Sequence, residues 1–200
     1  RGISHTEVAP ATETDMHSVQ LWIALPDDKK DMPAQFDHYP KLPEVQQDQV
    51  TYTVLVGDFQ GEQSPVQVHS ELVGVDLVAQ AATQTTLSLN PRFEYALLVL
   101  QGEVQVGEHQ LNDEQMLVLE TGMQQLDLQL SGDAHAVLIG GVPFESPVLL
   151  WWNFVGRTQQ EFELAREQWI NHDPRFGEVA NYPGERLIAP PMPDRIRAAK

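Results

Sequence analysis

The feature that most constrains this chain is a period-two alternation of side chains through its middle. From residue 50 to residue 56, valine and tyrosine at the even positions alternate with Thr51, Thr53 and Leu55. Successive side chains of a strand point to opposite faces of a sheet, so this alternation predicts a β-strand with one buried face. Similar short segments recur at residues 72–79, 85–89, 94–100, 116–119, 126–130 and 134–139.

Turn signals that contain glycine separate these segments. They include Gln101-Gly102, Val106-Gly107, Thr121-Gly122 and Ser131-Gly132. Glycine adopts the backbone conformations that tight turns require, and many short strands at close spacing are typical of antiparallel sandwiches and barrels. The sequence therefore predicts an all-β fold over residues 50–145.

One helix is predicted near the end of the chain. Thr158 and Glu161 have the spacing of a capping box, in which the hydroxyl bonds the backbone N–H three residues on and the carboxylate reaches back. Residues 171–174, which read N-H-D-P, are expected to end the helix, because proline cannot continue it. The buried face of the helix is expected to hold Phe162, Ala165 and Trp169.

A further strand is expected over residues 16–25, before a connector at residues 27–49. The connector begins with five charged residues in a row and contains three prolines. A single pair of strands cannot bury a core by itself. The first residues of the chain are therefore expected to belong to a different domain from the strands that begin at Val50.

The charge balance restricts the possible partners. Lys and Arg number 12 and Asp and Glu number 29, which gives a formal net charge of −17. Such a surface repels phosphate backbones and anionic lipid head groups, so direct binding to nucleic acid or to a membrane is not expected. The plainer interpretation is an acidic surface that keeps a cytoplasmic protein in solution.

Several reaction classes are excluded by residue type. The chain has no cysteine, which rules out disulfides, thiolate catalysis and cysteine-ligated zinc or iron–sulfur sites, and fits a reducing compartment. No serine has the G-x-S-x-G context of a hydrolase nucleophile. Gly140-Gly141 is a two-residue turn and not a phosphate loop.

His5 and Glu7 form a candidate metal motif, H-x-E. In an extended segment residues i and i+2 project to the same side, so both side chains can point at one ion. Imidazole with carboxylate suits a redox-active Fe(II), and nickel, copper or manganese also fit. On its own the motif is weak evidence, since polar surface residues produce it more often by chance.

Four stretches of the chain resemble the pirin family of cupins. Residues 1–7, R-G-I-S-H-T-E, are similar to the second metal motif of that family, and residues 20–26, Q-L-W-I-A-L-P, to a neighbouring strand. Residues 151–155, W-W-N-F-V, and residues 189–193, A-P-P-M-P, resemble its carboxy-terminal region. Together the four stretches span nearly the whole chain.

The resemblance implies a bicupin, in which two antiparallel cupin (jelly-roll) barrels face each other. Residues 1–26 would be the final strands of the first, metal-binding barrel, which is incomplete in this chain, and residues 27–49 a linker. Residues 50–145 would form the second barrel, and residues 146–200 a strand, the helix and a proline-rich tail.

The resemblance also implies a metal site, because pirins hold one iron in the first barrel through three histidines and a glutamate. His5 and Glu7 match the H-x-E pair, whereas the H-x-H pair would precede His5 and has no counterpart in this chain. Fe(II) is therefore expected only with ligands that this chain lacks. Glu7 is also the candidate catalytic residue, since a metal-bound carboxylate can accept the proton of a phenol.

Two functions follow from the resemblance. One is a metal-dependent dioxygenase of the quercetin 2,3-dioxygenase type, with a flavonol as its small aromatic substrate. The alternative is a non-catalytic, iron-bearing and redox-sensitive partner of a regulatory protein. A chain with a net charge of −17 favours a protein partner with a basic patch.

The second barrel is expected to be structural and without a metal. Alignment with cupin strands puts Ser88 and Asn90 at the H-x-H positions, and Asp127 and Gln129 at the H-x-E positions. A slip of one residue would place two leucines at the second pair instead, because register shifts exchange the faces of a strand. Neither alignment provides an imidazole.

The other histidines have weaker assignments. His17 shares the strand parity of the apolar residues that follow it, so it either orients a ligand imidazole or, more simply, lies in the core or at its rim. His38 and His172 stand beside Asp in loop contexts, where turn and capping roles are expected. No role is assigned to the isolated histidines His69, His109 and His135.

Overall fold

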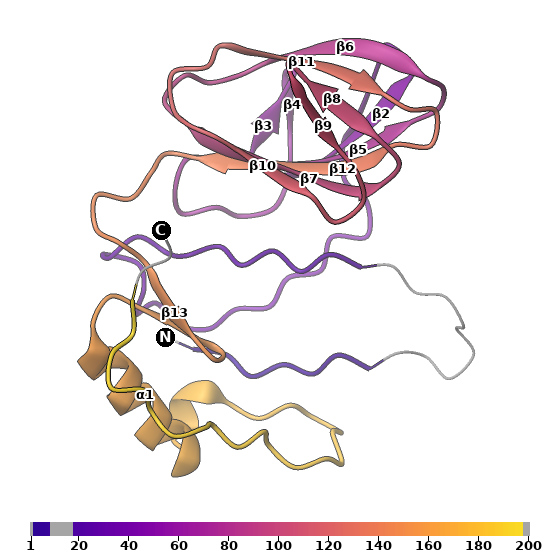
Figure 1. The fold of residues 1–200 in the computed structure, drawn as a ribbon. Coiled ribbons are helices and arrows are strands. Elements are labelled where there is room, and N and C mark those ends of the chain that lie inside the picture. The colour runs from indigo at the N-terminus through magenta and orange to yellow at the C-terminus, as the bar shows by residue number, and fades with distance from the viewer. Residues whose placement is uncertain (1, 9–17, 198–200) are drawn as a thin grey trace. The chain divides into compact units, whose positions relative to one another are not determined.

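The structure, a computed structural model, describes residues 2–8 and 18–197 (Figure 1). It contains two compact units. One unit is the continuous segment Asp37–Pro143, and the other combines Arg1–Phe36 with Phe144–Lys200. The carboxy-terminal segment therefore belongs to the same unit as the H-x-E motif.

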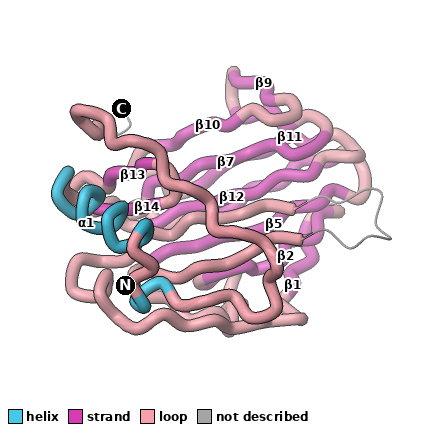
Figure 2. Tube along the Cα trace, turned by 90° about the horizontal axis from the view of Figure 1, so that it is seen from below, coloured by secondary structure: helices cyan, strands magenta, loops and turns pink. Residues whose placement is uncertain are grey.

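Two antiparallel sheets build the unit Asp37–Pro143. The larger sheet has six strands in the order β1-β2-β5-β12-β7-β10, which lie side by side in Figure 2. The smaller has four strands in the order β6-β11-β8-β9, and β3 and β4 form a separate hairpin. The strands are β1 Glu44–Gln47, β2 Val50–Val56, β3 Asp58–Phe59, β4 Glu62–Gln63, β5 Leu72–Ala79, β6 Thr83–Ser88, β7 Glu94–Gln101, β8 Val104–Val106, β9 His109–Leu111, β10 Met116–Leu119, β11 Gln125–Leu130 and β12 His135–Gly141.

The core of this unit is apolar, as the alternation predicts. Val50, Tyr52 and Val54 of β2 are fully buried, whereas the residues between them are partly exposed. Full burial of one such side chain contributes about 1.5–3 kcal/mol. Strands of both sheets supply the buried residues, so the core lies between the sheets. The predicted all-β fold is confirmed.

The second unit contains a hairpin and a helix. β13, Leu149–Trp151, pairs with β14, Phe154–Gly156. α1, Gln159–Ile170, begins where the capping box predicts, and the short 3-10 helix η1, Pro174–Phe176, follows it. Within the described residues, no helix has the length and apolar character needed to cross a membrane. The aromatic core of the unit consists of Trp151, Trp152, Phe154, Phe162, Trp169 and Phe176.

Two expectations about the first quarter of the chain differ from the structure. Residues 18–25 are not a strand, because no described segment forms a hydrogen-bonded ladder with them, and residues 16 and 17 lie outside the described residues. β1 lies inside the predicted connector, because Glu44–Gln47 pairs with β2 at the edge of the larger sheet.

Candidate metal centre

His5 and Glu7 lie in the extended segment of residues 2–8, and their side chains approach each other. His5 Nε2 lies 3.8 Å from Glu7 Oε1. Two donor atoms that share an ion at bond lengths of about 2.1 Å lie no more than about 4.2 Å apart. The pair thus fits two ligand positions of one metal ion. Among the described residues, no group of three or more His, Cys, Asp and Glu side chains could hold an ion.

A second extended segment brings Gln20 to this pair. Gln20 Nε2 donates a hydrogen bond to Glu7 Oε1 at 2.5 Å and lies 3.5 Å from His5 Nε2. Trp22 Nε1 donates in turn to Gln20 Oε1 at 2.7 Å. The sequence patterns single out both stretches, but they contain no signal that Gln20 connects them. That connection is visible only in the structure.

Residues 2–8 are held against η1. The Ser4 N–H donates to the carbonyl oxygen of Phe176 at 2.9 Å. Gly2 has φ +109°, and a β-carbon at this position would lie 3.0 Å from the Phe176 ring. Glycine is the residue that combines this backbone conformation with so close an approach. The glycine before the H-x-E motif therefore helps to determine where the motif lies.

The Gln20 segment is held by residues just before α1 and in its first turn. Arg157 Nη2 donates to the carbonyl oxygen of Leu25 at 2.8 Å, and Arg157 Nε lies 3.0 Å from Asp27 Oδ1. A few residues further on, Lys30 Nζ lies 2.5 Å from Glu161 Oε1. Arg157 follows Leu25 by 132 positions, so a distant part of the chain fixes this half of the site.

Glu161 takes part both in the ion pair with Lys30 and in the N-terminal cap of α1. The Thr158 hydroxyl accepts from the Glu161 N–H at 3.3 Å, and the Glu161 carboxylate reaches back to the Arg157 N–H at 2.5 Å. Burial is the largest single influence and opposes ionisation, but hydrogen bonds from Lys30 and from the backbone outweigh it and lower the pKa of Glu161 below its ordinary 4.5. The hydrogen bond to Glu161 also raises the pKa of Lys30 above its ordinary 10.5.

An apolar groove in this unit is linked to the candidate site through Trp22. It has a volume of about 350 Å³. Trp22 lines the groove, and its indole N–H bonds Gln20, which in turn bonds Glu7, so two hydrogen bonds link a groove residue to the His5–Glu7 pair. The remaining lining residues are Ile23, Ala24, Val148, Leu150 and Val155.

The inward face of β6 differs from the one that the cupin alignment predicts. Ser88 and Asn90 are exposed, whereas Leu87 and Leu89 are buried. The alignment of Ser88 and Asn90 with inward-facing ligands is therefore wrong. The alternation of β6 places leucine, and not a polar residue, on the core side of the strand.

The open choice of register on β11 is resolved by the structure. Leu126 and Leu128 are each 1% exposed and belong to the core, whereas Asp127 and Gln129 are exposed. β11 pairs with β6 so that Leu126 lies opposite Leu87. The slipped alignment, with leucines at the inward positions, is therefore the correct one.

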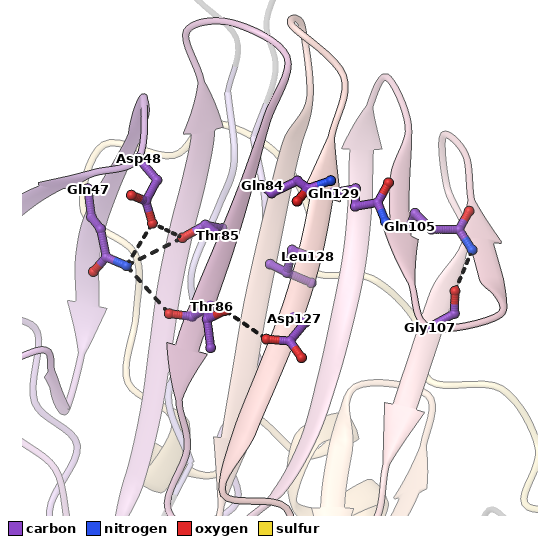
Figure 3. Close-up of a pocket in the computed structure, with 10 residues that line it drawn as sticks. All are labelled: Gln47, Asp48, Gln84, Thr85, Thr86, Gln105, Gly107, Asp127, Leu128 and Gln129. Atoms are coloured by element: carbon purple, nitrogen blue, oxygen red, sulfur yellow. Dashed lines mark hydrogen bonds between the residues drawn. The ribbon is translucent and has the colours of Figure 1, made fainter.

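A polar groove of about 380 Å³ crosses the smaller sheet (Figure 3). Gln129 of β11 lies in register between Gln84 of β6 and Gln105 of β8, so three amides form one row. Beside this row, the buried Thr85 hydroxyl donates to Asp48 Oδ2 at 3.0 Å and also bonds the buried Tyr52 hydroxyl at 2.9 Å. The groove offers hydrogen-bonding groups and lies in the unit that does not contain His5 and Glu7.

Two of the other histidines have partners in the structure. His135 has a partner that the sequence does not reveal, since its Nε2 lies 2.6 Å from Asp76 Oδ1 on the neighbouring strand β5. His172 follows α1 with φ 56°, and its N–H donates to the Trp169 carbonyl at 3.2 Å, which confirms a turn role. His17 lies outside the described residues.

Comparison with known protein sequences gives consistent matches. The model of the Pirin C-terminal cupin domain matches residues 74–177. A Pseudomonas aeruginosa protein named "Putative quercetin 2,3-dioxygenase" is 42% identical over 197 residues, which cover 98% of this chain and 62% of the relative. Human pirin is 26% identical over 82% of this chain and 59% of its own length. The chain thus spans about 60% of the length of these curated relatives.

Comparison with solved structures agrees on the fold. A quercetin 2,3-dioxygenase from Acinetobacter baumannii superposes with a TM-score of 0.84 and 51% identity, over 90% of this chain and 60% of that one. A second quercetin 2,3-dioxygenase structure from the same organism shares the fold at 20% identity and a TM-score of 0.72, over 78% of this chain and 55% of its own. The predicted cupin fold is therefore confirmed. Because the family model covers more than half of the sequence, this chain belongs to the pirin family of cupin proteins.

Proposed function

We propose that this protein is a metal-dependent dioxygenase of the quercetin 2,3-dioxygenase type, with a flavonol as its substrate. The supporting observation is that His5 Nε2 and Glu7 Oε1 lie 3.8 Å apart, in a chain 42% identical to a relative named as such an enzyme. His5 and Glu7 would hold the ion, with Fe(II) preferred over nickel, copper or manganese. Such an ion supplies redox chemistry toward dioxygen when it is bound.

The apolar groove suits an aromatic substrate. Its volume of about 350 Å³ falls in the range of about 300–1,000 Å³ that is typical of small-molecule sites. Trp22 offers a ring to the groove, and its N–H is linked through Gln20 to Glu7. The Glu7 carboxylate can accept the proton of a phenolic hydroxyl, and Gln20 and Trp22 connect it to the groove in which an aromatic ring would bind.

Oxygen uptake by the protein at its natural full length tests this function. The protein is loaded in turn with Fe(II), Ni(II), Cu(II) and Mn(II) and mixed with quercetin. We expect uptake with at least one ion, and its loss in His5→Ala and in Glu7→Gln. His109→Ala is the matched control, because His109 is an exposed histidine in the other unit, and it should retain activity.

Absence of oxygen uptake with all four ions would overturn the dioxygenase. Stoichiometric iron in the same inactive preparation would then favour the alternative, an iron-bearing protein that acts through a regulatory partner. Metal analysis of the purified protein is therefore made on the same sample.

A further inference from the structure

We propose that Gln20 is a positioning residue for the His5–Glu7 pair and that Trp22 determines the orientation of its amide. Because it concerns the same metal site, this role of Gln20 rests on the proposed function. The sequence motif draws attention to His5 and Glu7, whereas the hydrogen bonds draw attention to the residue between them.

The amide nitrogen of Gln20 lies near both donor atoms. It is 2.5 Å from Glu7 Oε1 and 3.5 Å from His5 Nε2. An amide NH₂ group only donates, so its approach to His5 is favourable when the neutral ring carries its proton on Nδ1. In that tautomer the single Nε2 lone pair faces the amide, and a bound ion would take over this lone pair while the amide keeps its hydrogen bond to Glu7. Gln20 therefore selects the tautomer of His5 and orients the Glu7 carboxylate for an ion.

The indole of Trp22 prevents the Gln20 amide from adopting the flipped orientation, in which its oxygen and nitrogen exchange places. Trp22 Nε1 carries a hydrogen and cannot accept, and it lies 2.7 Å from Gln20 Oε1. A reversed amide would place its carbonyl oxygen against the Glu7 carboxylate and its NH₂ group against the indole N–H. Both contacts would be repulsive. The amide of Gln20 consequently presents its hydrogens to Glu7.

The backbones that carry these side chains are held by other contacts. The Ser4 N–H is bonded to Phe176, and the Leu25 carbonyl is bonded to Arg157. Gln20 therefore bridges two segments that are each attached elsewhere in the unit, so the distance it spans is set independently of its own hydrogen bonds. Removing a group that orients a metal ligand typically weakens metal binding by about 10- to 100-fold.

Co(II) titration of the protein at its natural full length tests the role of Gln20. Gln20→Met keeps the side-chain length and removes the donors, and Trp22→Phe keeps an aromatic ring and removes the indole N–H. We expect Gln20→Met to weaken Co(II) binding by about 10-fold or more. We also expect both variants to change the visible absorption of bound Co(II), which reports ligand geometry and which a purely structural role would leave unchanged.

The matched control is Gln110→Met. Gln110 Nε2 donates to Glu103 Oε2 at 3.2 Å, which is also an exposed contact between an amide and a carboxylate, but in the other unit. Its Co(II) affinity and spectrum should equal those of the unaltered protein. Gln20 and Trp22 are themselves exposed, so their variants should fold, as circular dichroism can verify. Gln20→Leu serves as a second variant that also lacks the donors.

His5→Ala separates the failure of this inference from the failure of the proposed metal site. Suppose that His5→Ala loses Co(II) binding while Gln20→Met, Gln20→Leu and Trp22→Phe keep the original affinity and spectrum. The metal site then stands, and the positioning role of Gln20 is overturned. If His5→Ala binds Co(II) as tightly as the unaltered protein, the ligand role of His5 is wrong, and the role of Gln20 falls with it.

Discussion

Lys30 Nζ lies 2.5 Å from Glu161 Oε1, although 131 positions of sequence separate the two residues. The contact attaches the segment that follows the Q-L-W stretch to the first turn of α1. The two side chains are 37% and 34% exposed. Ion pairs this accessible to water contribute about 0.2–1 kcal/mol. The main effect of the pair is therefore to fix the position of the segment around Lys30 against the first turn of α1, rather than to add stability.

Lys30→Met is expected to destabilise this unit by about 0.2–1 kcal/mol at neutral pH. The pKa of Glu161 is lowered in the folded protein, so the stability from its charged form is present above the ordinary value of 4.5 and is lost as the pH falls through the folded pKa. The difference in the free energy of unfolding between the variant and the unaltered protein should therefore disappear at acid pH. Thermal unfolding between about pH 3 and about pH 8 measures it.

Lys29→Met is the control for this prediction. Lys29 Nζ lies 3.6 Å from Asp28 Oδ2, and both side chains are more exposed than those of Lys30 and Glu161. This substitution should change stability less and without the acid dependence. If Lys30→Met lowers the free energy of unfolding equally at every pH, Lys30 is not coupled to the ionised carboxylate of Glu161.

The register of β11 can be tested with two adjacent substitutions. Leu128 is buried and Gln129 is exposed. Leu128→Ala should lower the free energy of unfolding by about 2–5 kcal/mol, since it leaves a cavity in the core. Gln129→Ala should change it by no more than about 0.5 kcal/mol. Urea unfolding of both variants is the measurement, and equal effects would show that the inward face is wrong.

Tyr52 is expected to remain protonated in the folded protein when accessible tyrosines ionise. Burial is the main cause that raises the pKa of Tyr52 above its ordinary 10.0, and the hydrogen bond to Thr85 offsets only part of it. This stability is fully present below the unfolded pKa and is lost as the pH rises toward the folded pKa, because Tyr52 ionises first in the unfolded chain. Ultraviolet titration of tyrosinate and unfolding at alkaline pH measure both effects.

Tyr52→Phe removes this alkaline dependence because phenylalanine cannot ionise. At neutral pH it should cost about 1 kcal/mol, since Thr85 loses a buried hydrogen-bond partner. If the free energy of unfolding falls equally with alkaline pH in the variant and in the unaltered protein, the assignment of this dependence to Tyr52 is wrong.

Gly2→Ala is expected to displace the H-x-E segment from η1. The added β-carbon would lie 3.0 Å from the Phe176 ring, at a φ of +109° that side chains rarely adopt. We expect Co(II) binding to weaken by about 10-fold, as when the support of a ligand is lost. Gly61→Ala is the control, because Gly61 also has a positive φ, +87°, but has nothing within 4 Å of its β-carbon position. Unchanged Co(II) binding in Gly2→Ala would contradict the role of this contact.

Most of the longer strands were predictable because their signal is local. The expected strands at 50–56, 72–79 and 116–119 coincide with β2, β5 and β10, and the other four expected strands differ by at most two residues at either end. The short strands β1, β3, β4, β8 and β9 were not predicted. Residues 18–25 were not predictable in the same way, since an extended segment becomes a strand only when another segment pairs with it.

The error at β6 came from preferring a motif alignment to the local pattern. Leu87 and Leu89 share one parity, which by itself indicates that this face is buried. Placing Ser88 and Asn90 at ligand positions required the opposite face to point inward. The structure agrees with the simpler pattern, because apolar side chains gain most from leaving water.

The sequence by itself determined that His5 and Glu7 can face one ion, because residues two apart in an extended segment project to one side. It also determined the alternation that fills the barrel core. Only the tertiary structure decided that Gln20 joins the pair. The segment of Gln20 is held by Arg157, and the segment of His5 and Glu7 is held by Phe176; both partners lie far along the chain, and no local rule relates residues at that separation.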